Sequence, residues 1–144
     1  MFLFRCVVLD HCRNSTIVLG PIESTLLVAD CVDCLIIASA RRVVVLSCRR
    51  CTLHLLSSTR PLLIQPPFTS NSTSTGDSHS CPPSPLPGIA HGGNEDIVFA
   101  PFHTTYPEFR QHLDKTALDL TVNYWDQPLV FGRILSRINL YFSL

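Results

Sequence analysis

Hydrophobic and polar positions repeat along the first third of the chain. Three segments superpose without gaps, at residues 7–18, 26–37 and 43–54. Each reads as an apolar run, a short polar step, a Cys, two further residues, a Cys or Ser, and a second apolar run. The first Cys recurs after 19 and then 17 residues, and self-similarity at a period of about this length is typical of solenoid proteins. The repeat therefore predicts consecutive coils of one solenoid.

The apolar runs of the repeat have the character of strands. Ile17-Val18, Leu35-Ile36-Ile37 and Val43-Val44-Val45 are short, rich in β-branched residues and bounded by turn residues. Stacked coils place equivalent residues above one another, so each Cys is expected in a ladder and each apolar run covers the face that its neighbour leaves open. The sequence predicts an all-β fold, a parallel β-helix whose coils occupy residues 1–64.

Residues 65–94 break the pattern. They contain six Pro, four Gly and nine Ser or Thr residues, with almost nothing to bury, which predicts a low-complexity insertion without regular structure. A strand pattern resumes directly afterwards in Asp96–Ala100. The insertion is therefore expected to bulge from a coil, with the final strand of the β-helix in residues 95–104.

The last part of the chain has a helical pattern. Thr105-Tyr106-Pro107-Glu108 has the form of a capping box with Pro in the first turn, and Tyr106, Phe109, Leu113 and Ala117 recur at spacings of three or four. This predicts one amphipathic helix over residues 106–118. A second helical face is suggested by Phe131, Ile134, Ile138, Tyr141 and Phe142, so residues 105–144 are expected to pack on the β-helix as a helical extension and tail.

Composition narrows the class of protein. The 144 residues suffice for one domain, and eleven Lys and Arg balance eleven Asp and Glu, which argues against a nucleic-acid partner. No apolar stretch is long enough to span a membrane, and the first residues lack the basic start of a secretory signal. Seven Cys, about 5% of the chain and an odd number, fit reduced thiols in the cytoplasm.

Three segments carry a resemblance to a known family: Cys12–Thr25, Leu55–Pro61 and Phe99–His103. They resemble the tubulin-binding cofactor C domain, also called the C-CAP/cofactor C-like domain, which implies a right-handed parallel β-helix. Thr105-Tyr106-Pro107 and Asn123–Pro128 are similar to one subgroup, the TBCC domain-containing proteins, which is associated with the centrosome or basal body. The family's domain normally has sequence ahead of this first coil, so a fragment with an exposed coil end is expected.

The resemblance also bears on catalysis. Catalytic members of the family resemble GTPase-activating proteins that hold an arginine finger on one strand in a Gln-x-Arg motif. Counted back without gaps from Leu55–Arg60, the motif falls on Arg42-Val43-Val44, which puts Val44 at the finger position. Valine offers neither charge nor a hydrogen-bond donor, so the resemblance implies a chain without this activity. Arg42 lies two residues away on the same strand face, displaced by roughly 6.5 Å, whereas Arg41 points to the opposite face.

The paired Cys residues leave two interpretations open. Cys31-x-x-Cys34 and Cys48-x-x-Cys51 have a spacing close to that of a four-Cys zinc site. The same positions hold Cys12 and Ser15 in the first repeat, however, and a β-helix explains them as a ladder of small buried residues. We favour the ladder, and therefore expect no metal and no cofactor.

Two arginine doublets, Arg41-Arg42 and Arg49-Arg50, are the remaining binding candidates. The simplest interpretation is solvated turns near strand ends, and the alternative is one basic patch for an acidic partner such as a tubulin tail.

The sequence thus predicts a non-catalytic binding or scaffold module of the cofactor C type. Its expected partner is a protein, tubulin or an Arf-like GTPase, and its expected location is the cytoplasm, at the cytoskeleton, centrosome or basal body. The alternatives are a GTPase-activating protein for one of these partners that acts through Arg42, and a zinc-binding module.

Overall fold

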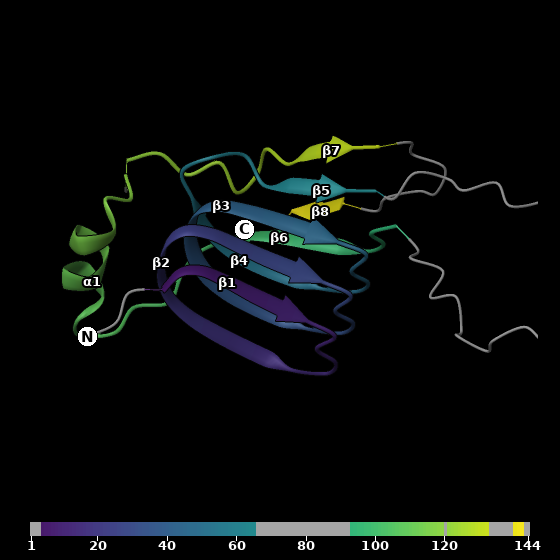
Figure 1. The fold of residues 1–144 in the computed structure, drawn as a ribbon, viewed down its shortest axis with the longest axis horizontal. Coiled ribbons are helices and arrows are strands. Elements are labelled where there is room, and N and C mark those ends of the chain that lie inside the picture. Colours follow the sequence, from purple (N-terminus) through teal and green to yellow (C-terminus); the bar gives the residue numbers. More distant parts are fainter. Residues whose placement is uncertain (1–3, 66–92, 120, 133–139, 143–144) are drawn as a thin grey trace, which may run out of the picture.

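The fold is a stack of parallel strands. The computed structural model describes residues 4–65, 93–119 and 121–132, together with the backbone of 140–142. Its elements, in chain order, are β1 (Phe4–Asp10), β2 (Thr16–Ala29), β3 (Leu35–Leu46), β4 (Thr52–Ser57), β5 (Leu62–Ile64), β6 (Ile97–Pro101), α1 (Phe109–Thr116), β7 (Leu129–Phe131) and β8 (Leu140–Phe142). All the pairings between these strands are parallel. They form a β-solenoid of about three turns with one short helix, which confirms the predicted all-β class (Figure 1).

The strands form two walls around one core. β2 and β3 bend midway, so the first half of each pairs in one wall and the second half in the other. Wall A consists of the first halves of β2 and β3 together with β4, β6 and β8. Wall B consists of the second halves of β2 and β3 together with β1, β5 and β7. Fully buried residues such as Leu26, Val43 and Leu53 fill the space between the walls.

A short third side closes each coil. It carries single parallel bridges that link Arg13 to Val32, Val32 to Arg49, and Arg49 to Glu95. On either side of these bridges the chain turns through residues with φ between 48° and 55°: His11, Asn14, Asp30, Asp33, Ser47, Arg50 and Asp96. Asn and Asp tolerate this left-handed conformation better than most residues, and they hold four of these seven positions. The short polar step of the sequence repeat is therefore the corner of the coil.

The Cys residues of the repeat line these corners. Cys31, Cys34, Cys48 and Cys51 are at most 3% exposed. Each thiol donates a hydrogen bond to the carbonyl oxygen two residues before it, at 3.3–3.4 Å. A small side chain that can satisfy a nearby carbonyl suits a tight buried turn, so the structure accounts for the pairs as a stacked ladder.

The fourth corner replaces Cys with Asn. Asn94 is fully buried, and its Oδ1 accepts a hydrogen bond from the Cys48 N–H at 2.9 Å. Its Nδ2 donates to the carbonyl oxygens of Val45 and Ile64 at 3.2 and 3.1 Å. Asn94 therefore ties the fourth corner to two strands of wall B.

Gln65 and Gly93 complete this connection. The Gln65 Oε1 accepts a hydrogen bond from the Asn94 N–H at 2.7 Å, and the Gln65 side chain is 4% exposed. A Cβ atom at Gly93 would collide with the Gln65 carboxamide, so a larger residue there would have to displace the group that binds the Asn94 N–H. The predicted insertion over 65–94 is thus too long at both ends, because Gln65 and Asn94 are buried and hydrogen-bonded within the solenoid. The rest of the insertion, residues 66–92, lies outside the described residues.

The C-terminal elements differ from the predicted pattern. The helix covers only residues 109–116 and packs on β2 through Phe109, Leu113 and Thr116. Glu108 occupies its N-cap position without a side-chain hydrogen bond, so the capping box predicted at Thr105 does not form. A helical tail is also wrong in its described parts: β7 pairs with β5 and β8 pairs with β6, so β6 is not the final strand.

Because Gln65 and Gly93 are in contact, the segment between them leaves and re-enters the fold at one point. We expect that replacing residues 66–92 with about six Gly and Ser residues leaves the free energy of unfolding unchanged or raises it by about 1 kcal/mol, since a shorter loop costs less closure entropy. Thermal and denaturant unfolding of the two proteins checks this. A clear loss of stability would show that the segment packs on the solenoid.

The Asn94 connection also predicts a stability effect. Asn94→Ala removes the acceptor of the Cys48 N–H and the donor to the carbonyl oxygens of Val45 and Ile64, so we expect it to lower the free energy of unfolding by about 2–4 kcal/mol. The neighbouring exposed change Glu95→Ala is the control and is expected within about 0.5 kcal/mol of the parent. Equal effects of the two changes in denaturant unfolding would contradict the role given to Asn94.

Candidate functional site

The outer face of wall B carries a continuous apolar row. Parallel pairing aligns Val8 with Leu27, Leu27 with Val44, Val44 with Leu62, and Leu62 with Leu129. The flanking residues of these five point into the core, so the five side chains face outward. We call this row the apolar strip; it crosses five strands, or roughly 19 Å at the usual strand spacing.

The strip is partly open to solvent. Val8 is 61% exposed and Leu129 37%, and Leu27, Val44 and Leu62 are half-buried. Phe131, the next outward residue of β7, is 64% exposed. Contiguous apolar surface of this kind marks interaction sites more often than single exposed apolar residues do.

Val44 lies at the centre of this strip. It pairs with Leu27 on one side and Leu62 on the other, and both neighbours are apolar. Arg42 is two residues earlier on the same strand, where it pairs with Thr25, and its side chain is exposed. The position that the resemblance assigns to an arginine finger is therefore apolar and lies between apolar side chains of the two neighbouring strands.

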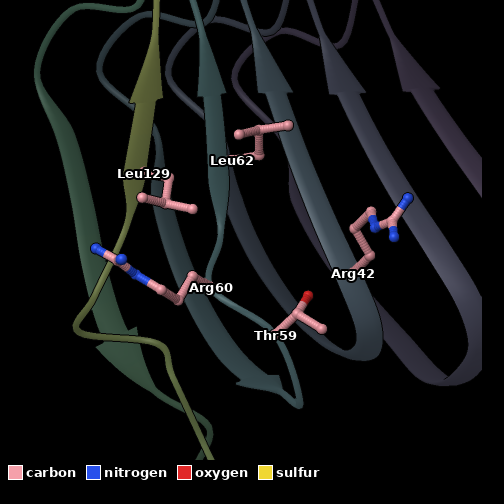
Figure 2. A pocket seen from close by; sticks show the side chains of 5 residues that line it. All are labelled: Arg42, Thr59, Arg60, Leu62 and Leu129. Carbon is pink, nitrogen blue, oxygen red and sulfur yellow. The ribbon is translucent and has the colours of Figure 1, made fainter.

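An open pocket of about 300 Å³ adjoins the strip. It is lined by Arg42, Thr59, Arg60, Leu62 and Leu129. Figure 2 shows Arg42 and Arg60 on opposite sides of the pocket, with Thr59 between them at one end.

Backbone contacts hold the turn that supplies half of this pocket. The Thr59 hydroxyl and its N–H both donate to the Arg41 carbonyl oxygen, at 2.8 and 3.1 Å. The Arg60 Nε donates to the Gln127 carbonyl oxygen at 2.8 Å, and the Leu129 N–H donates to the Pro61 carbonyl oxygen at 2.7 Å. The pocket is thus built from coils that are joined in register.

The two arginine doublets occupy different places. Arg41 and Arg42 lie at the bend of β3, whereas Arg49 and Arg50 lie at the third side, beyond the other end of the strand. Arg50 donates two hydrogen bonds to the Asp33 carboxylate, at 2.6 and 2.8 Å, and this contact lowers the pKa of Asp33. The four arginines of the doublets therefore lie in two separate places, and of these four it is Arg42 that lines the pocket.

The sequence pattern misses the other pocket residues. Arg60 follows Arg42 by 18 residues, close to the coil period, so extending the repeat by one coil would have found it. Leu129 carries no such signal, because the insertion and α1 separate it from the repeat.

The stacked thiols do not converge on one point. Successive coils are spaced by roughly 4.8 Å, whereas the four sulfur atoms of a zinc site lie roughly 3.8 Å apart. Within the described part of the chain, the group of three potential ligands that lie within 4.8 Å of one another is Asp10, His11 and Asp30, which includes no Cys.

Neighbouring thiols of the ladder influence one another's pKa values. Hydrogen bonding with Cys31 and Cys51 and burial raise the pKa of Cys48, and burial raises the pKa values of Cys12 and Cys34. The contact with Cys48 lowers the pKa values of both Cys31 and Cys51.

Comparison with known proteins decides the family. The family model described as tubulin binding cofactor C matches residues 1–76. The chain belongs to this family. The apolar strip, the pocket and Val44 are therefore features of a cofactor C-type chain.

Relatives extend the similarity beyond the matched segment. TBCC domain-containing protein 1 of Mus musculus is 35% identical over 126 residues, which is 88% of this chain and 18% of the relative. The Homo sapiens protein of the same name is 34% identical over 129 residues, 90% of this chain and 18% of the relative. The Danio rerio protein of the same name is 32% identical over 126 residues, which is 88% of this chain and 17% of the relative. The chain therefore spans about 18% of the length of these relatives.

One further property concerns membranes. In the portion of the chain that the structure describes, no helix combines the length and the apolar character needed to cross a bilayer.

The ladder geometry makes a prediction about metal. We expect the purified chain to hold no stoichiometric zinc, because the stacked thiols are too far apart to share one ion. Elemental analysis by mass spectrometry measures this directly. The contrary result is one zinc ion per chain that is lost when Cys31 and Cys51 are both changed to Ser but is kept in the control variant Cys6→Ser. It would show that the ladder residues are ligands.

Proposed function

We propose that this cofactor C-type chain is a non-catalytic protein-binding or scaffold module, and that the outer face of wall B is its binding surface. The observation that carries the proposal is the apolar strip with Val44 at its centre. The family description supports a tubulin-related partner, and tubulin and an Arf-like GTPase are the two candidates. The proposed location is the cytoplasm, at the cytoskeleton and its centrosome or basal body.

The chemistry of Val44 supports the absence of catalysis. An arginine finger accelerates phosphoryl transfer by placing a guanidinium against the charge that develops on the γ-phosphate oxygens. Valine has no donor and no charge, and its neighbours Leu27 and Leu62 supply none either. The centre of the strip suits burial against an apolar partner surface instead.

A second candidate function rests on Arg42. Its side chain is exposed on the same face as Val44 and lines the pocket. A GTPase bound two residues out of register along β3 could meet this guanidinium, displaced by roughly 6.5 Å from the finger position. Because fingers act at hydrogen-bond distance, this candidate ranks second.

We expect the chain to leave single-turnover GTP hydrolysis by purified tubulin and by an Arf-like GTPase unchanged. Radiolabelled or chromatographic detection of GDP, with and without the chain, measures this. Acceleration that Arg42→Ala abolishes would establish the second candidate and contradict the proposed one.

A gain-of-function variant extends the experiment. Val44→Arg places a guanidinium at the finger position without changing the rest of wall B, so activity in this variant alone would show that a GTPase docks on this face. Phe131→Asp, which puts a charge on the same face, is expected to weaken partner binding at least tenfold in biolayer interferometry. If tubulin or the GTPase binds the Phe131→Asp variant as tightly as it binds the parent, the result contradicts the proposed surface.

A further inference from the structure

Three exposed arginines lie near the bend between the walls. Arg41 and Arg42 lie on β3, and Arg60 lies on the turn of the next coil, beside Thr59. Among the residues that the structure describes, none of the three arginines forms an ion pair with a carboxylate. Arg50, by contrast, is bound by Asp33. The described residues therefore leave the positive charge of these arginines without a carboxylate partner.

The pocket beside these arginines is amphipathic. Leu62 and Leu129 line it together with Arg42 and Arg60, and both leucines belong to the apolar strip. Figure 2 shows the two arginines flanking the pocket from opposite sides, so they are placed to meet two different acidic groups rather than one. Its open shape suits a side chain presented from another surface rather than an enclosed small molecule.

We propose that this pocket binds an acidic segment of a protein partner, with one apolar side chain against Leu62 and Leu129 and carboxylates on either side against Arg42 and Arg60. The proposal rests on the proposed function, because it names the chemistry that the partner brings to wall B. Arginine pairs with carboxylates through two parallel hydrogen bonds, and the leucines add contact that a carboxylate alone cannot use.

The same observations disfavour other anionic partners. A nucleic-acid backbone would place its charged phosphates against the two leucines, which offer them no favourable contact. The formal net charge of the chain is also zero, so it does not attract a polyanion. An anionic membrane would meet the arginines from a flat surface, whereas Leu62 is only half-exposed within the pocket. A protein segment can present both acidic and apolar side chains from one backbone.

The test uses the full chain and a fluorescein-labelled peptide, Glu-Glu-Phe-Glu-Glu, with fluorescence anisotropy as the readout. We expect saturable binding that weakens with added NaCl, since exposed charge pairs are screened by salt. The double variant Arg42→Gln with Arg60→Gln is expected to weaken binding at least tenfold. Arg13→Gln is the matched control, because Arg13 is equally exposed but lies on the third side of the solenoid.

Two further peptides separate the contributions of charge and apolar contact. Gln-Gln-Phe-Gln-Gln tests the carboxylates and Glu-Glu-Ser-Glu-Glu tests the apolar side chain, and each is expected to bind at least fivefold more weakly than the parent peptide. Methyl NMR spectra should show the largest shifts at Leu62 and Leu129. Thermal unfolding of each variant confirms that the surface changes leave the fold intact.

Several results would overturn the proposal. These are no binding at millimolar peptide, equal binding by the double variant and the parent, or shifts confined to residues outside the pocket. Binding to phosphatidylserine vesicles that needs Arg42 and Arg60, without peptide binding, would assign the pocket to a membrane instead. If the peptide fails while tubulin or the GTPase still binds in a manner sensitive to Phe131→Asp, the proposed function stands and only the acidic segment is wrong.

Discussion

The in-register stacking of parallel coils is the constraint on which the rest of the structure depends. Each coil lies roughly 4.8 Å above the last, so a corner that one coil makes must be made at the same place by the next. At matched positions of successive coils, residues such as Asp33 and Arg50 adopt the left-handed backbone conformation, and small buried thiols lie beside them.

The fourth corner shows how the same constraint is met after an interruption. The chain leaves the solenoid after Gln65 and must return with the corner geometry intact. Asn94 takes the Cys position and binds the Cys48 N–H and two strand carbonyl oxygens, while Gln65 binds the Asn94 N–H. The polar side chains are fully satisfied at this buried point, which is the condition under which buried polar groups stabilise a fold.

The sequence predicts those parts of the fold that repeat, and misses those fixed by distant contacts. The Cys period and the β-branched runs suffice for the solenoid, because each coil repeats the pattern of its neighbour. Composition assigns Gln65 and Asn94 to the insertion, since their partners lie across the gap. The three-residue strand at Leu129–Phe131 is too short for periodicity to separate it from a helix, and its pairing with β5 fixes it instead. The pocket is missed for the same reason, because Leu129 reaches it only through that pairing.

The stacking that builds the core also orders the outer face of wall B. Because the inward row is apolar and in register, the outward row is in register too, and any residue at position 44 must lie between Leu27 and Leu62. An arginine there would extend a charged group across an apolar row. In this chain the centre of the row is apolar and the positive charge lies at its margin, on Arg42 and Arg60. An apolar centre with a charged margin supports the proposal of a binding surface, because phosphoryl transfer needs the charge at the centre, against the reacting phosphate.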